Sequence, residues 1–142
     1  KGVALSLVDT AGAIDRTLAR AAAEANLVII PTRTSQLDVQ SLADTLGYLE
    51  DTKALGKAVI VINATRANED AAAVRALAER YRVPVASIVL RDRAQYSKAL
   101  DEGRGITEKS ARSEAARDIQ ELFDWLEAHD ASFATAPARE TV

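Results

Sequence analysis

The sequence predicts an α/β fold, a doubly wound parallel sheet with helices on both faces. Four short apolar runs lack the apolar–polar alternation of a half-exposed strand, at residues 3–8, 27–30, 58–63 and 86–90. Segments whose apolar residues recur at helical spacing follow the first three runs, at residues 14–25, 36–49 and 69–81. Buried strands that alternate with helices are typical of a parallel sheet covered on both faces.

The individual elements have local signals as well. Pro31 ends the second apolar run, and β-branched residues fill the third, which favours strands at both places. Ser35 can cap the helix at residues 36–49. After the fourth strand we expect a short helix at 94–102, a glycine loop at 103–105 and a last helix at 110–129.

Composition limits the class of protein. The chain has 142 residues, is 48% hydrophobic and 27% charged, and carries a formal net charge of −3. These values predict one domain, at residues 3–130, with a disordered tail at 131–142. No apolar run approaches the ~18–20 residues that span a bilayer. With no cysteine and one histidine, thiolate nucleophiles and histidine-based metal clusters are excluded.

Ligands of doubly wound sheets bind beyond the carboxyl ends of the strands. Asp9 and Gly12 stand there, in the tetrapeptide Asp9-Thr10-Ala11-Gly12 that follows the first run. A strand-end carboxylate can hold magnesium, and a glycine lets a backbone N–H approach a γ-phosphate. The alternative is that Asp9 only caps the next helix.

Asn63 ends the third predicted strand, where its amide could read the edge of a base by donating and accepting hydrogen bonds. A turn-forming asparagine is the simpler explanation. Asp38 lies in a first helical turn, where stabilisation by the helix dipole is a sufficient role.

Basic residues concentrate between positions 91 and 112 of an otherwise mildly acidic chain. They could contact phosphates of a nucleotide or of DNA, although such residues are more often solvated. The set comprises Arg91, Arg93, Lys98, Arg104, Lys109 and Arg112.

A phosphate-binding loop is not found in the sequence. Neither G-x-x-x-x-G-K-[ST] nor G-x-G-x-x-G occurs. Leu55-Gly56-Lys57 lacks the first glycine and the trailing hydroxyl, and it precedes a strand, which is the wrong side for a phosphate cradle.

Several segments, in this order and spacing, resemble the ParA family of partition ATPases. They are Val-Asp-Thr-Ala-Gly at 8–12, Ala-Asn-Leu-Val-Ile-Ile-Pro at 25–31, Ser-Gln-Leu-Asp-Val-Gln-Ser-Leu at 35–42 and the arginine-containing run 87–108. The similarity extends from residue 3 to about residue 128. It implies a P-loop NTPase-like sheet with its amino-terminal part missing.

The resemblance also implies an activity: ATP-dependent partitioning of plasmid or chromosomal DNA in the bacterial cytoplasm, at the nucleoid. Such an ATPase uses ATP and Mg²⁺, dimerises around ATP, binds DNA non-specifically and is stimulated by a ParB-like centromere-binding partner. Asp9 would hold Mg²⁺ through water, and Gly12 would donate its N–H to the γ-phosphate. Asn63 would bind adenine, flanked by the backbone of Leu90, Arg91 and Asp92. Arg93, Lys98, Arg104, Lys109 and Arg112 would be candidates for DNA contact.

The sequence departs from the family at its start. The Lys-Gly-Gly-x-Gly-Lys-Thr loop, the first helix and the switch I acid belong before residue 3 and do not occur. We therefore expect the carboxyl-terminal two-thirds of a ParA-like protein, with no ATP hydrolysis by this chain alone. A sheet without its central first strand would have exposed edges that invite association.

Two other classes of protein stay open. A membrane-associated ATPase of the MinD type needs a basic amphipathic helix at the carboxyl terminus, and residues 131–142 offer no such face. A non-catalytic α/β interaction module would bind partners only, and nucleotide binding discriminates it from an ATPase.

Overall fold

The computed structural model describes residues 5–10, 16–66 and 69–129. Two strands, β1 (Val28–Thr32) and β2 (Ala58–Ile62), pair in parallel with Val28 opposite Ala58 and Thr32 opposite Ile62. The parallel pairing of these two predicted strands is confirmed. The described residues form a mixed α/β structure with a two-stranded sheet, a simpler arrangement than a doubly wound sheet.

The expected strand at residues 86–90 is not a regular strand. This segment lies beside β2, where Ala86 N–H donates to Ile60 O at 2.8 Å and Leu90 N–H donates to Ile62 O at 2.9 Å. Four residues thus span the length of two residues of β2, so the backbone bulges between these bonds. Only isolated parallel bridges remain, from Ile60 to Val85 and from Thr65 to Arg91.

The expected first strand is wrong for residues 5–8, and residues 3–4 of that prediction lie outside the described part of the chain. Residues 5–10 form neither a strand nor a helix, and Leu7 and Val8 are 79% and 71% exposed. An apolar run becomes a strand only where a sheet edge pairs with it. Among the described residues, no edge pairs with this segment.

The predicted helices are confirmed with shifted ends: α1 (Arg16–Glu24), α2 (Gln36–Asp51), α3 (Ala72–Tyr81), α4 (Ala94–Leu100) and α6 (Glu114–His129). Residues 14–15 lie outside the described residues. Ser35 caps α2 as expected, because its Oγ accepts from the Asp38 N–H at 3.3 Å. Two short helices were not predicted, η1 (Leu55–Lys57) and α5 (Ile106–Lys109).

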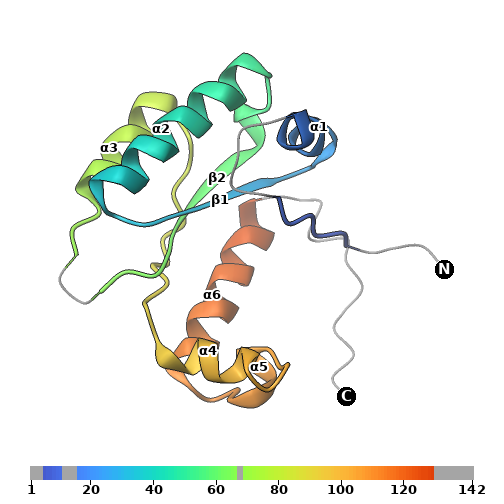
Figure 1. Ribbon diagram of the computed structural model, residues 1–142, viewed down its shortest axis with the longest axis vertical. Helices are drawn as coiled ribbons and strands as arrows, with labels where there is room; N and C mark the ends of the chain where they lie inside the picture. Colours follow the sequence, from blue (N-terminus) through green and yellow to red (C-terminus); the bar gives the residue numbers. More distant parts are fainter. Residues whose placement is uncertain (1–4, 11–15, 67–68, 130–142) are drawn as a thin grey trace.

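The core has layers on both sides of β2. One cluster joins α2 and α3 to the sheet through Leu46, Val74 and Ile60. On the opposite side, Val61 of β2 belongs to a cluster that includes Leu122 and Trp125 of α6. In Figure 1, α2 and α3 lie together above the sheet, and α6 runs below it towards α4 and α5. Helices therefore cover both faces of β2.

No helix within the described ranges is long and apolar enough to cross a membrane. The tail predicted at residues 131–142 lies outside those ranges.

Candidate functional site

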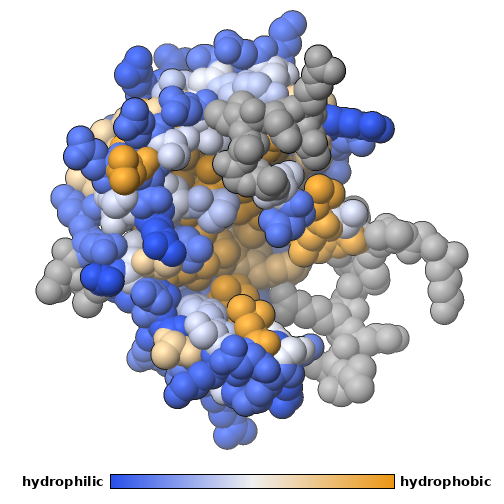
Figure 2. All heavy atoms as spheres, viewed as in Figure 1, coloured by the Kyte–Doolittle hydropathy of each residue, from blue (hydrophilic) through white to orange (hydrophobic). Residues whose placement is uncertain are grey.

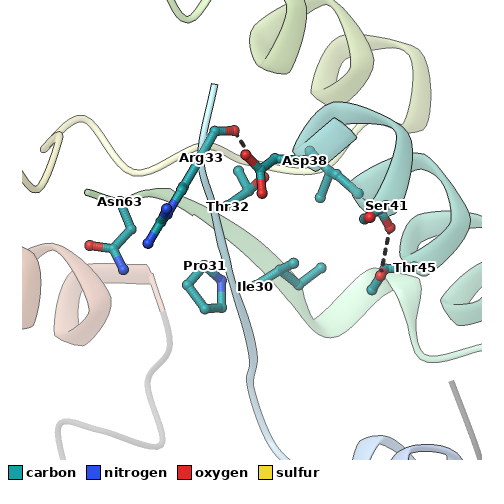
Figure 3. A pocket seen from close by; sticks show the side chains of 9 residues that line it. Ile30, Pro31, Thr32, Arg33, Asp38, Ser41, Thr45 and Asn63 are labelled. Carbon is teal, nitrogen blue, oxygen red and sulfur yellow. Dashed lines mark hydrogen bonds between the residues drawn. The ribbon is translucent and has the colours of Figure 1, made fainter. Parts of the chain in front are cut away.

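The carboxyl ends of β1 and β2 meet at a cavity of about 290 Å³. Residues of β1 and the turn after it, the first turns of α2 and Asn63 after β2 surround this cavity, as Figure 3 shows. Its lining consists of Ile30, Pro31, Thr32, Arg33, Asp38, Ser41, Leu42, Thr45 and Asn63. The cavity thus lies where parallel α/β sheets bind ligands.

Asn63 is held by hydrogen bonds of its backbone N–H and of its side-chain oxygen. Its N–H donates to Thr32 O at 2.7 Å, and its Oδ1 accepts from the Ala64 N–H at 2.8 Å. Within the described chain, nothing accepts from the amide NH₂ group. The local bond fits a turn-forming asparagine, whereas the unpartnered NH₂ leaves a donor for a ligand at the cavity wall.

Ala64 has a left-handed backbone conformation, with φ of 50°. This conformation is costly for a residue with a Cβ atom and recurs where a binding site constrains the chain. It follows Asn63 directly, so the strain falls at the carboxyl end of β2.

Leu90 and Asp92 lie beside the turn that follows Asn63. Thr65 N–H donates to Leu90 O at 3.2 Å, and Asp92 N–H donates to Thr65 O at 2.9 Å. Arg91 is exposed, and its Nη1 donates to Arg66 O at 3.4 Å. The segment 90–92 is therefore adjacent to residues 65–66, only two positions beyond Asn63.

Thr65 is buried, at 3% exposure, and its hydroxyl is the only buried side-chain polar atom in the described residues without a hydrogen-bond partner. A buried hydroxyl without a partner costs free energy, and native proteins rarely keep one without a reason. The sequence signal for Thr65 was weak, because nothing in a single threonine after a strand predicts whether its hydroxyl is paired.

Asp38 has a local role at the start of α2. The Ser35 hydroxyl donates to its carboxylate, and its own N–H donates back to Ser35 Oγ. This reciprocal cap favours the helix-dipole interpretation. The same carboxylate contributes to the cavity wall.

Asp9 is exposed and lies outside any strand, and Gly12 lies outside the described residues. No group of three or more His, Cys, Asp or Glu side chains that could hold a metal ion occurs in the part of the chain that the structure describes. The Mg²⁺ role predicted for Asp9 and the phosphate role predicted for Gly12 therefore stay predictions.

Two of the basic residues, Arg93 and Lys109, form ion pairs with carboxylates of the described chain. Arg93 donates from Nη1 to Glu114 Oε2 at 2.6 Å and from Nε to Asp118 Oδ2 at 3.1 Å. Burial lowers the pKa of Arg93, but these hydrogen bonds and charges outweigh it, so the pKa lies above its usual value. Lys109 pairs with Glu102 and also donates to Lys98 O at 2.8 Å.

The other basic candidates are exposed. Lys98 is on α4, and Arg112 is in the turn before α6. Neither makes an ion pair with another described residue. Arg104 uses one guanidinium N–H for Glu108 O at 3.1 Å, and it makes no ion pair with the residues that the structure describes.

Arg33 and Thr45 also line the cavity, although no sequence motif singled them out. No protein-family model matches the sequence, and a search of curated proteins finds no relative.

Proposed function

We propose that this chain is the base-binding part of an ATP-dependent DNA-partition protein of the ParA type. Its support comes from the sequence motifs and from one structural observation, the cavity between the carboxyl ends of β1 and β2 with Asn63 in its wall. For the fold, we propose that a ParA-type protein with this chain as its base-binding part has a doubly wound, P-loop NTPase-like sheet.

The residues present suit the base of a nucleotide. Asn63 offers an NH₂ donor for a ring nitrogen of adenine, and the peptide groups of 90–92 lie beside the turn that follows it. The unpaired Thr65 hydroxyl adds a second polar group next to this segment. Of these groups Asn63 lines the cavity, whereas the Thr65 hydroxyl is buried and is not part of its wall, so the proposal assigns the contact with the base to the Asn63 NH₂ group.

The same residues do not suit triphosphate and Mg²⁺. The 142 residues contain no glycine-rich phosphate loop, and among the described residues Asp9 belongs to no group of three or more side chains that could hold a metal ion. We therefore derive no hydrolytic step and expect no ATP turnover by this chain alone. Measurable turnover would contradict this part of the proposal.

For DNA, the proposal relies on Lys98, Arg104 and Arg112, because Arg93 and Lys109 already neutralise carboxylates. Three phosphate contacts would give a salt dependence of log K with a slope of about −3. Replacing all three by Ala should remove most of that slope in a fluorescence-anisotropy titration with duplex DNA. Replacing Arg117, another exposed cation, should change it little if these three carry the binding.

The nucleotide proposal is tested by amide NMR spectra of the 142-residue chain titrated with adenosine and with MgATP. We expect weak binding of both, of similar affinity, because phosphates gain no loop contacts. The amides of 63–66 and 90–92 should shift most. Shifts confined to other regions, or no shifts at saturating adenosine, would refute the site.

A matched pair of variants separates the role of Asn63 from a general effect. Asn63→Asp removes the NH₂ donor and adds a charge, and we expect at least a 10-fold loss of adenosine affinity. Asn26→Asp makes the same change at an exposed residue before the amino end of β1 and should leave the affinity within about twofold. Equal losses would show that added charge alone, rather than the Asn63 donor, controls binding.

A further inference from the structure

The free edge of β1 and the apolar segment 5–8 are both unpaired in the described structure. β1 has β2 on one side only. Segment 5–8 (Leu-Ser-Leu-Val) pairs with no described strand, although its composition favours a strand. A free sheet edge and a free strand-forming segment are complementary, because each offers the backbone partners that the other lacks.

The free edge follows from the hydrogen-bond pattern of β1. Thr32 O accepts from Asn63 N–H, so the backbone of Thr32 faces β2. Backbone groups alternate sides along a strand, so Ile29 and Pro31 turn theirs outward. Pro31 offers a carbonyl but no N–H, whereas Ile29 offers both groups, and its side chain is 38% exposed.

The residues of β1 and of segment 5–8 bring no charge to this edge. Neither β1 nor segment 5–8 contains a charged residue, although edge strands are commonly protected by lysine or other charges. Leu5, Leu7 and Val8 are three of the six large apolar side chains exposed on the described surface. In Figure 2, orange, apolar side chains gather around the sheet and the neighbouring segment 5–8.

We propose that two copies of this chain associate by strand exchange, with segment 5–8 of each copy added to the β1 edge of the other. A second copy is favoured over pairing within one chain because, among the described residues of one molecule, both features are unpaired. The exchange is reciprocal, so a twofold axis satisfies both edges and both segments at once. Neither segment 5–8 nor β1 carries a charge, so the two paired strands themselves add no like-charge repulsion.

The proposal does not depend on nucleotide binding and is tested by sedimentation equilibrium of the 142-residue chain without ligand. We expect a concentration-dependent monomer–dimer equilibrium. Leu7→Asp should raise the dimer dissociation constant about 10- to 100-fold per buried leucine contact. A monomer at all concentrations would overturn the proposal. Pairing of segment 5–8 with β1 of the same molecule would also overturn it, and this pairing would appear as protected amides in a monomer.

Leu37→Asp is the matched control. Leu37 is 77% exposed, close to the 79% of Leu7, but it lies in the first turn of α2. We expect the dimer dissociation constant of this variant to stay within about twofold of the parent value. The fold should tolerate the change, because an acidic residue in the first turn interacts favourably with the helix dipole. If both variants dissociate the dimer equally, the contact is not the proposed one.

Amide hydrogen exchange distinguishes strand pairing from a general apolar contact. In the dimer, the amides of Ile29 and of segment 5–8 should be protected, and dilution or Leu7→Asp should remove that protection. A dimer whose Ile29 amide exchanges as fast as in the monomer would overturn strand exchange. Circular dichroism of both variants shows whether each keeps the parental helix content.

Discussion

Replacing Thr65 by Val should stabilise this protein. The two side chains have nearly the same shape, and the valine lacks the hydroxyl. Thr65 is 3% exposed, and its hydroxyl has no partner among the described residues. No hydrogen bond is therefore lost, and the cost of burying an unpaired polar group disappears.

The expected gain in the free energy of unfolding is about 1 kcal/mol, at the lower end of the ~1–3 kcal/mol cost of a buried unsatisfied group. In urea denaturation, with a slope of ~1–2 kcal/mol/M, the midpoint should rise by about 0.5–1 M. Thr32→Val is the control, because Thr32 is also buried but its Oγ1 donates to Arg33 O at 3.1 Å. That variant loses a hydrogen bond and should gain no stability.

A loss of stability in Thr65→Val would refute this reasoning, because it would mean that the hydroxyl is satisfied. The same variant bears on function. If the hydroxyl is kept for a ligand, Thr65→Val should weaken adenosine binding while it strengthens the fold. Stabilisation without weaker binding would remove Thr65 from the site.

Three further predictions concern stability. A double-mutant cycle on Arg93 and Asp118, measured in urea, should give a coupling of about 1 kcal/mol, because both side chains are about three-quarters buried; a coupling near zero would refute an anchoring role. Arg82→Gly should raise the free energy of unfolding by about 1 kcal/mol, because Arg82 ends α3 with φ of 56°; lower thermal stability would contradict this. Burial, then the Asp118 carboxylate, raises the pKa of Tyr96 above 10.0, although Arg93 opposes this. The contribution of Tyr96 to the free energy of unfolding is therefore complete below about pH 10 and is lost as pH rises through the folded pKa. Tyr96→Phe should make the free energy of unfolding fall less steeply over this pH range.

The helices could be predicted closely because their signals are local. Apolar spacing and the Ser35 cap located α2 without reference to the rest of the chain. The four-residue helix α5 was missed because it depends on one capping contact, from Gly105 N–H to Glu108 Oε2 at 2.9 Å. A helix this short has too few residues for a periodic pattern.

The strands and the site were predicted less well because they depend on partners distant in sequence. Segments 5–8 and 86–90 both look like strands by composition, but neither forms a regular ladder. Arg93 looked like a free cation, and only the folded chain brings it to Asp118, 25 residues later. The position of Asn63 was predictable, because a buried run ends there; the local bond from Ala64 to its Oδ1 was not.

The most direct test of the proposed site is the side-chain NH₂ resonance of Asn63 during an adenosine titration. We expect this signal to move downfield and to saturate together with the amides of 90–92, because the NH₂ group donates to the base. The side-chain signal of Asn26, at the other end of β1, should stay in place. Saturable adenosine binding that leaves the Asn63 NH₂ signal unchanged would exclude Asn63 as the donor to the base.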